Sequence, residues 1–202
     1  MTLGFRKNAV ALGILVGIAT ATVGCGDEVD PVVIEDEDGH RVFVTSGVYS
    51  GNLELVGNED SPIENADYVC NVHASEEELD GLWKAWMSTQ DRAAIDRIDD
   101  YGPWFLIDEE QRVADDVDEL SATGPRTPIN MREDGEIIDS RFEVWTGTKA
   151  GGQSADDTCA DWSSLSELTF GQFGSAADAD GDWTDADRGS CDESRRFYCF
   201  EQ

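Results

Sequence analysis

Five cysteines constrain the fold of this chain more than any other feature of its sequence. Cys25 stands at the end of an apolar N-terminal run. The other four follow well behind it, at Cys70, Cys159, Cys191 and Cys199. An even set of cysteines in an exported domain predicts two disulfides, and spacing alone leaves the three possible connectivities open. Zinc binding is the alternative, but no two cysteines have the close Cys-x-x-Cys spacing, and only His40 and His73 could add nitrogen ligands.

Residues 1–24 predict an export signal. Arg6 and Lys7 precede an apolar run that is too short for a membrane span of about 20 residues but suits a signal-peptide core. The segment 21–25, Ala-Thr-Val-Gly-Cys, resembles a bacterial lipobox, in which the cysteine is acylated after cleavage. Cys25 is therefore the expected lipid anchor. An ordinary signal peptide cut nearby and a retained anchor are the alternatives.

The residue after the cysteine and the acidic segment that follows predict where the protein resides. Gly26 follows the cysteine, so the residue best known for inner-membrane retention is absent from that position. We therefore expect the protein at the outer membrane or cell surface of a Gram-negative bacterium. Residues 25–40 contain seven acidic residues around Pro31 and few core residues. This composition predicts an extended tether between the lipid and a domain over residues 41–202.

The balance of 44 acidic against 14 basic residues gives the chain a formal net charge of -30. A field of that sign repels phosphate backbones and anionic lipid headgroups, which excludes nucleic acid as a partner. A solvated surface, of the kind found on exported or salt-adapted proteins, is the plain interpretation. Cation binding is the functional one.

Residues 41–202 contain the patterns of a mixed α and β domain. Runs of β-branched and aromatic residues predict strands at 41–46, 82–87, 104–108 and 142–148. An Asp-Gly turn at 134–135 predicts a hairpin within 127–138. The stretch that follows residue 148 is rich in Gly, Ser and Asp, and we expect a long loop without regular structure there, tied down by a disulfide.

Two helices are expected. Ser61, Pro62 and Glu64 combine an N-cap, a proline at the first helical position and a capping box. This helix places Cys70 on its buried face and His73 near the surface at its end. A second, short helix is expected to begin after a cap at residue 88 or 89 and to run through residue 99.

The order of these parts resembles a known family. The motifs that carry the resemblance are Val42 to Ser46, Trp83 to Ser88, Pro128 to Gly135, Trp145 to Thr148 and Phe197 to Gln202. With the cysteine-bearing helix, they look like the bacterial endostatin-like lipoprotein domains of the DUF1554 type, whose fold resembles that of C-type lectins. The resemblance covers residues 41–202. It implies an α+β domain in which two short helices pack on mainly antiparallel sheets, with a long loop region pinned by a disulfide.

The resemblance also implies a nested pairing of the cysteines. Cys70 of the first helix would bond Cys199 of the final strand, and Cys159 would bond Cys191. The first bond would join the two ends of the domain, and the second would pin the long loop. In the chain-entropy model each contributes roughly 3 to 5 kcal/mol to stability.

The sugar and calcium site of C-type lectins is only partly matched. Those lectins use a Glu-Pro-Asn or Gln-Pro-Asp triplet in the long loop, followed by Trp-Asn-Asp just before the third cysteine. No proline occurs between Cys159 and Cys191, so the first triplet is missing. The segment 183–185, Trp-Thr-Asp, is similar to the second triplet but lies farther from Cys191 than the usual pattern has it.

The same loop nevertheless contains candidate ligand-binding residues. Acidic residues recur there at Asp178, Asp180, Asp182 and Asp185. Oxygen ligands on alternate residues, with Gly181 allowing a tight turn, suit Ca²⁺, which takes about six to eight oxygens. Calcium binding is one hypothesis, and a solvated acidic loop is the other. We also expect Trp162 and Trp183 to be partly exposed and, with Asp185, to contact a ligand, whereas the tryptophans in the strand-like runs belong to the core.

Arg195 and Arg196 are rare positive charges near the C-terminus. We expect them to pair locally with Asp192 or Glu193. Recognition of an anion is the alternative.

The sequence contains no catalytic constellation. A serine or cysteine nucleophile needs a nearby base, usually histidine, and only His40 and His73 occur. The prediction is therefore a surface-anchored lipoprotein that acts as a non-catalytic binding or adhesion module for an extracellular protein or glycan. No cofactor is required, and Ca²⁺ is the one candidate ion. The alternatives are a calcium-dependent carbohydrate-binding lipoprotein and a structural envelope protein without a soluble ligand.

Overall fold

The computed structural model of the protein describes residues 39–138 and 142–202, all of which belong to one compact unit. The predicted signal peptide, the lipidated Cys25 and nearly all of the predicted tether lie outside the described residues. His40, the last residue assigned to the tether, already belongs to the first strand.

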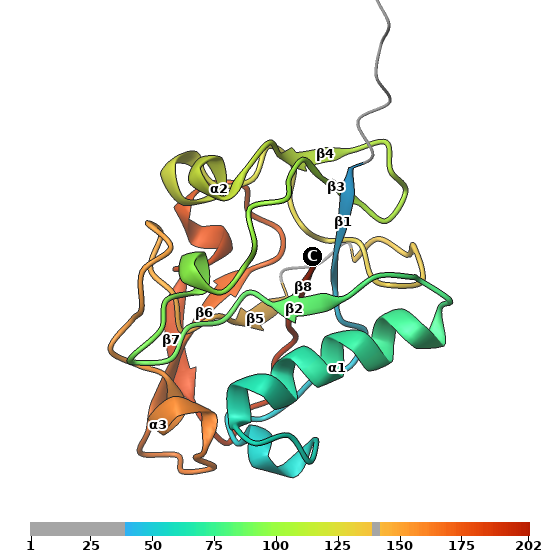
Figure 1. The fold of residues 1–202 in the computed structure, drawn as a ribbon. Helices are drawn as coiled ribbons and strands as arrows, with labels where there is room; N and C mark the ends of the chain where they lie inside the picture. The colour runs from blue at the N-terminus through green and yellow to red at the C-terminus, as the bar shows by residue number, and fades with distance from the viewer. Residues whose placement is uncertain (1–38, 139–141) are drawn as a thin grey trace, which may run out of the picture. The chain divides into compact units, whose positions relative to one another are not determined.

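The described residues form short strands and a few short helices (Figure 1). The strands are β1 (His40–Val44), β2 (Trp83–Ala85), β3 (Trp104–Leu106), β4 (Arg112–Ala114), β5 (Glu143–Trp145), β6 (Phe170–Ser175), β7 (Asp187–Ser190) and β8 (Tyr198–Glu201). The α-helices are α1 (Pro62–Glu76), α2 (Val117–Thr123) and the single turn α3 (Cys159–Trp162). Short 3₁₀ turns are η1 (Leu53–Leu55), η2 (Ala94–Asp96) and η3 (Gly181–Trp183). The mixed α+β class expected from the sequence is therefore confirmed.

One sheet joins the two ends of the domain. Its strand order is β2-β8-β1-β3-β4, and β8 pairs antiparallel with both β2 and β1, whereas β1 and β3 are parallel. The last strand thus lies inside this sheet, beside the first (Figure 1). The strands predicted over 41–46, 82–87 and 104–108 correspond to β1, β2 and β3.

The core lies on both faces of this sheet because side chains alternate along each strand. Val42 and Val44 contact one cluster of buried residues, and Phe43 between them contacts the other. On β8, Tyr198 faces the first cluster and Cys199 the second. The sheet is covered on each side, which explains why its strands contain apolar residues at nearly every position.

Helix α1 covers the second face and is joined to the sheet by a disulfide between Cys70 and Cys199, the outer disulfide. The helix begins at the predicted N-cap, Ser61, whose hydroxyl donates to the Glu64 carboxylate at 2.8 Å instead of capping a backbone N–H. The buried face includes Cys70, as the helical spacing predicted.

A buried ion pair fixes the same helix to β2. The Arg97 guanidinium donates to both carboxylate oxygens of Asp67 at 2.7 Å and to the Ala85 carbonyl at 2.7 Å, and Asp67 also accepts from the Ala85 N–H at 2.8 Å. These bonds join α1, β2 and the segment after β2. Arg97 is 4% exposed, so the Asp67 carboxylate, and not water, compensates its positive charge.

The helix predicted to run from residue 88 or 89 through 99 was wrong in extent. Only the 3₁₀ turn η2 forms there. Ser88, expected as a possible cap, is fully buried: its hydroxyl lies 2.8 Å from that of Thr148 and accepts from the Ala94 N–H at 2.8 Å. These bonds hold the chain in an irregular path. Conversely, α2 was not predicted, although Asp116 accepts from the Glu119 N–H at 2.7 Å as its N-cap.

The predicted long loop also contains more structure than expected. β6 and β7 pair antiparallel with each other, and β6 pairs with β5, which makes a second sheet of order β5-β6-β7. The glycines that suggested a loop lie instead where neighbouring segments pack too closely for a side chain. A Cβ added to Gly174 would lie 1.9 Å from the Trp183 carbonyl oxygen, and one on Gly171 would lie 2.7 Å from Cys159 Sγ. Glycine at these positions allows the close approach of neighbouring segments.

Candidate functional site

The segment before β6 is fixed by a disulfide between Cys159 and Cys191, the inner disulfide. Both disulfides therefore follow the nested pairing that the family resemblance implied. The inner disulfide packs closely against residues 50–52, because a Cβ on Gly51 would lie 2.4 Å from Cys159 Sγ. It ties the residue after β7 to the first residue of α3.

The single turn α3 is left-handed. Its four residues have φ values of 52°, 54°, 52° and 63°, and none of them is glycine. A left-handed turn costs roughly 1 to 2 kcal/mol per L-residue, so other interactions must hold it. The inner disulfide fixes its first residue, and the fully buried Trp162 fixes its last by donating from Nε1 to the Ser88 carbonyl at 2.8 Å.

The sheet formed by β5, β6 and β7 presents a row of polar and aromatic side chains on one face. Ser175 lies opposite Glu143 on β5, and Phe173 lies opposite Asp187 on β7. Residues directly opposite each other, and residues two apart on one strand, share a face of the sheet. These four side chains therefore lie on the same face.

A cleft of about 270 Å³ opens over this face, and we call it the acidic cleft. Four carboxylates line it, from Glu143, Asp178, Asp182 and Asp187. The rings of Phe142 and Phe173, the hydroxyl of Ser175 and the methyl group of Ala186 complete its lining. No lysine, arginine or histidine is among the described residues that line it.

The Ser175 hydroxyl is the unusual group of the acidic cleft. Ser175 is 6% exposed, and its Oγ has no hydrogen-bond partner in the described part of the chain. Leaving a buried hydroxyl unpaired costs about 1 to 3 kcal/mol, and such groups are rare in native proteins. Because Ser175 lines the cleft, a bound molecule that reaches this hydroxyl would supply the missing hydrogen bond.

Arg195 packs against the same face of this sheet, beside the cleft, because a Cβ added to Gly189 of β7 would lie 2.1 Å from its Nη2. Its guanidinium carbon lies 4.1 Å from the ring centre of Trp145 and 4.3 Å from that of Phe173. Its Nη2 contacts the carboxylates of Glu143 at 2.8 Å and Glu193 at 2.7 Å. The Glu143 carboxylate is thus partly compensated by an arginine that is itself 5% exposed.

The local pairing predicted for the two arginines is confirmed for Arg195, which pairs with Glu193. It was wrong for Arg196. This guanidinium donates instead to the carbonyl oxygens of Thr45 and Ser46 and lies 4.6 Å from the ring centre of Phe142. The two neighbouring arginines therefore face different segments.

The four carboxylates predicted to gather around calcium are divided among separate roles. Asp178 and Asp182 line the acidic cleft, whereas Asp180 accepts from the Asp182 N–H at 3.1 Å as the cap of η3. Asp185 accepts from Gln172 Nε2 at 2.7 Å and from the Ala150 N–H at 3.1 Å. Across residues 39–138 and 142–202, no group of three or more acidic, histidine or cysteine side chains is placed to hold a metal ion.

The two tryptophans predicted to be partly exposed are fully buried, so this expectation was wrong. Trp162 packs edge-on against Trp145 at a ring distance of 5.8 Å, and Trp183 packs against Trp86 at 5.0 Å. The segment folds back over the core, and burial of these large rings stabilises it. Of the residues predicted to contact a ligand, Asp185 alone is accessible, and it lies outside the lining of the acidic cleft.

A second polar cluster surrounds His73, which the sequence placed near the surface. The structure contradicts this: His73 is 7% exposed. Its Nδ1 lies 2.6 Å from a carboxylate oxygen of Glu133, and the Tyr49 hydroxyl lies 2.7 Å from Nε2. Because a carboxylate only accepts, Nδ1 carries a proton, and in a neutral ring Nε2 accepts from the tyrosine. The segment around Glu133 covers the helix end and removes it from solvent.

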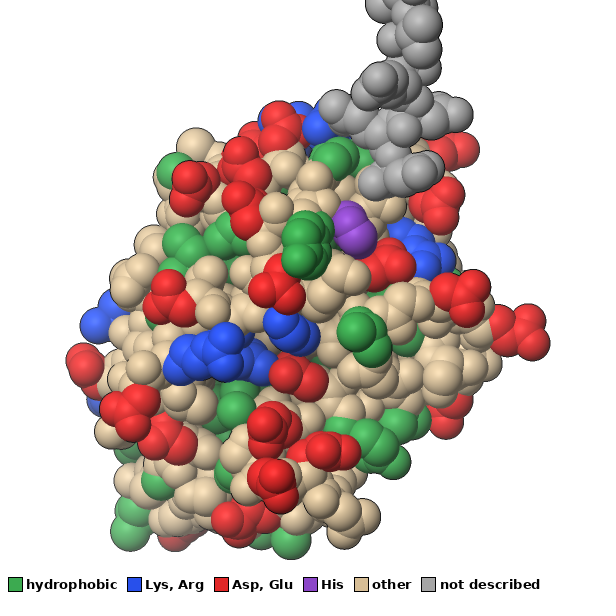
Figure 2. Space-filling model, viewed as in Figure 1, with side chains coloured by type: hydrophobic (Ala, Val, Ile, Leu, Met, Phe, Trp, Pro, Cys, Tyr) green, Lys and Arg blue, Asp and Glu red, His purple; other side chains and the backbone are tan. Residues whose placement is uncertain are grey.

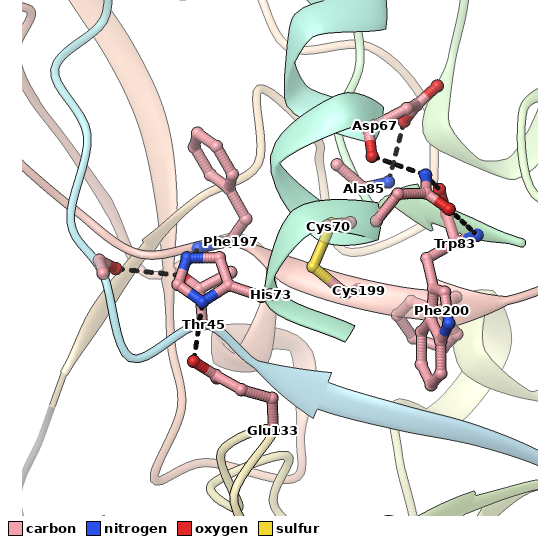
Figure 3. Close-up of a disulfide and its surroundings, with 12 residues drawn as sticks. Thr45, Asp67, Cys70, His73, Trp83, Ala85, Glu133, Phe197, Cys199 and Phe200 are labelled. Atoms are coloured by element: carbon pink, nitrogen blue, oxygen red, sulfur yellow. Dashed lines mark hydrogen bonds and ion pairs between the residues drawn. A yellow bond between two sulfur atoms is a disulfide. The ribbon is translucent and has the colours of Figure 1, made fainter. Parts of the chain in front are cut away.

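Glu133 is held in its charged form by these neighbours. Burial raises the pKa of the Glu133 carboxyl, but hydrogen bonds from His73 and Ser46 outweigh burial and leave this pKa below its ordinary value. Figure 3 shows His73 and Glu133 on one side of the outer disulfide and Asp67 on the other. Both ring nitrogens of His73 are thus engaged.

Comparison with known proteins places the chain in a family. A family model described as "Protein of unknown function (DUF1554)" matches residues 48–179, a range that runs from η1 through α1 and β2 to the end of β6. The chain belongs to the DUF1554 family. No curated protein matches it. The DUF1554 match ends at Ala179, so part of the acidic cleft, including Asp182 and Asp187, lies beyond it.

The described part of this DUF1554 protein contains no helix that is both long and apolar enough to cross a membrane.

Proposed function

We propose that this DUF1554 protein is an exported lipoprotein, anchored through Cys25, that binds an extracellular protein or glycan without catalysis. The observation that carries the proposal is the acidic cleft, whose wall contains a buried hydroxyl with no partner in the described part of the chain. A buried hydroxyl without a partner lowers the stability of the free protein, and a bound ligand can supply the missing hydrogen bond. Such a group is more typical of a binding site than of a structural surface.

A non-catalytic role is supported by the state of the groups on which catalysis would depend. Cys70, Cys159, Cys191 and Cys199 are all bonded in disulfides. His73 is buried between Tyr49 and Glu133. Within residues 39–138 and 142–202, no serine or cysteine side chain is hydrogen-bonded to this imidazole. The imidazole therefore does not serve as the base of a serine or cysteine nucleophile among the described residues.

The finer fold assignment is also part of the proposal. We assign the domain to the endostatin-like version of the C-type lectin-like fold. The antiparallel pairing of β1 with β8, the nested disulfides and the long segment between Cys159 and Cys191 support this assignment. Fold alone does not identify the ligand, so the binding function rests on the cleft.

An array of immobilised extracellular proteins and glycans, probed with the purified full-length chain, tests the function. We expect binding that is unchanged by a chelator and reduced in the double variant Asp182→Asn/Asp187→Asn. The control variant Asp156→Asn/Glu110→Gln removes the same charge from exposed positions outside the cleft and should bind as wild type does.

Three results would contradict the proposal. Sugar binding that disappears with the chelator would favour a calcium-dependent lectin. Equal loss in both double variants would show that total charge, and not the cleft, governs binding. An array without any bound ligand would favour a structural envelope protein.

A further inference from the structure

We propose that the acidic cleft takes a hydrogen-bond-donating organic cation: the ammonium or guanidinium end of a basic side chain or of a small polyamine. This inference rests on the proposed function, because it names the ligand class of the same site. It draws on three properties of the cleft: the sign of its charge, the unpaired hydroxyl of Ser175 and the size of the space.

The charge of the lining favours a cation. The described lining includes four carboxylates and no basic side chain, and Arg195, which pairs with Glu143 on the same face of the sheet, is 5% exposed and is not among the lining residues. Asp182 and Asp187 are exposed at the rim, and neither forms an ion pair within residues 39–138 and 142–202. A cleft lined by one sign of charge focuses its field and attracts the opposite sign.

The Ser175 hydroxyl provides a neutral acceptor in the wall. A hydroxyl can donate or accept, so by itself it does not set the sign of the ligand. Beside carboxylates, an N–H of an ammonium or guanidinium group would satisfy both kinds of acceptor. Hydrogen bonds to charged groups are stronger than neutral ones, so the hydroxyl would contribute measurably to affinity.

The size of the cleft favours one side chain or the end of a polyamine. Its volume of about 270 Å³ lies just below the range of roughly 300 to 1,000 Å³ typical of small-molecule sites. The rings of Phe142 and Phe173 offer apolar surface to an aliphatic stem, while the charged end meets the carboxylates.

A bare metal ion fits less well. Calcium needs about six to eight oxygens at close range, and the described residues contain no group of three acidic side chains placed to hold an ion. An ammonium or guanidinium group carries three to five N–H donors, which reach separate acceptors without requiring the carboxylates to converge.

Isothermal titration calorimetry of the purified full-length chain tests the inference with defined probes. Cadaverine and agmatine represent free amines and guanidines, and a short lysine-containing peptide represents a protein side chain. The probe 1,5-pentanediol is the neutral isostere of cadaverine, and calcium chloride is the metal probe. We expect saturable binding of a cationic probe at one site, with no binding of the diol.

The variants must separate the cleft from the general negative charge of the protein, because acidic side chains are scattered over the visible face (Figure 2). Ser175→Ala leaves the charge unchanged, and we expect it to raise the Kd about tenfold, the loss of one hydrogen bond to a charged group. Asp182→Asn/Asp187→Asn should raise the Kd further. The control Asp156→Asn/Glu110→Gln, with the same change of charge, should change it less than about twofold.

The inference is overturned if no cationic probe binds, if Ser175→Ala binds as wild type does, or if both double variants lose affinity equally. It is also overturned if calcium alone saturates the site. Array binding that is lost in the cleft variants while every cationic probe fails would leave the proposed function standing and refute only the ligand class. Failure of both the array and the probes would refute both.

Discussion

Replacing Ser175 with alanine should not destabilise this domain, although the residue is buried in a strand. Ser175 is 6% exposed and its hydroxyl has no partner in the described part of the chain, so the substitution removes a desolvated polar group and no hydrogen bond. Burying an unpaired hydroxyl costs about 1 to 3 kcal/mol. Some of this cost is offset by lost packing around the oxygen, and we expect the free energy of unfolding to rise by about 0 to 1 kcal/mol.

Ser88 provides a matched control, since it is fully buried and its hydroxyl is bonded. It lies 2.8 Å from the Thr148 hydroxyl and accepts from the Ala94 N–H at 2.8 Å. Ser88→Ala removes both bonds and leaves a buried N–H unpaired, which should lower the free energy of unfolding by about 1 to 3 kcal/mol.

Urea unfolding of the full-length chain, followed by tryptophan fluorescence, measures both variants under oxidising conditions. The reasoning is refuted if Ser175→Ala loses more than about 1 kcal/mol, because that loss would require a bonded hydroxyl. It is also refuted if the two serine variants lose equal stability. A stable Ser175→Ala variant with weakened ligand binding would identify a residue that serves function at a cost in stability.

Three further perturbations test the account of the fold. Removing the outer disulfide, whose cysteines are 129 residues apart, should lower the free energy of unfolding by about 5 kcal/mol. Removing the inner disulfide, whose cysteines are 32 residues apart, should lower it by about 3.7 kcal/mol. A larger loss for the inner disulfide in urea unfolding would contradict the chain-entropy explanation. Glu133→Gln should destabilise the domain by on the order of 1 to 3 kcal/mol near pH 7. The folded pKa of this carboxyl lies below its ordinary value of 4.5, so its contribution is present above that pH and is lost as the pH falls through the folded pKa. A difference between wild type and Glu133→Gln that stays constant on acidification would refute this. Asp67→Asn should cost about 3 kcal/mol, because it leaves the buried Arg97 charge without its carboxylate, and a near-neutral result in thermal unfolding would show that the carbonyl contacts of Arg97 suffice.

Elements with a local signal could be predicted from the sequence. The helix after Ser61 was recognised from its cap, its proline and its acidic third residue, and β1 was recognised from a run of β-branched and aromatic residues. Spacing could not select the disulfide pairing, because four cysteines allow three connectivities; the family resemblance supplied it.

Features that depend on contacts between distant residues could not be predicted. The two hydrogen-bond partners of His73, Tyr49 and Glu133, lie 24 and 60 residues away in the sequence, so nothing near the histidine indicated that its surroundings are buried. Gly171 and Gly174 suggested a loop, yet they lie in β6 because the inner disulfide and the backbone after Trp183 leave no room for a side chain. Missing β6 concealed the sheet face on which the cleft is built.

The segment predicted to bind a ligand overlaps the proposed site only in part. Asp178 and Asp182, two of the four predicted calcium ligands, line the acidic cleft. Trp162 and Trp183 do not line it, because both rings are fully buried and burial of such large apolar surfaces stabilises the fold. Ser175 carried no sequence signal, because an unpaired hydroxyl is recognised only from the surrounding structure.

Mapping of a bound cation by backbone amide chemical shifts tests the central claim most directly. Cadaverine would be titrated into isotope-labelled full-length chain, with 1,5-pentanediol as the neutral reference. The largest shifts should cluster on β5, β6 and β7 around Glu143, Ser175 and Asp187, and they should saturate together. Shifts spread evenly over the acidic surface, or centred on another part of the domain, would contradict the claim that the acidic cleft is the binding site.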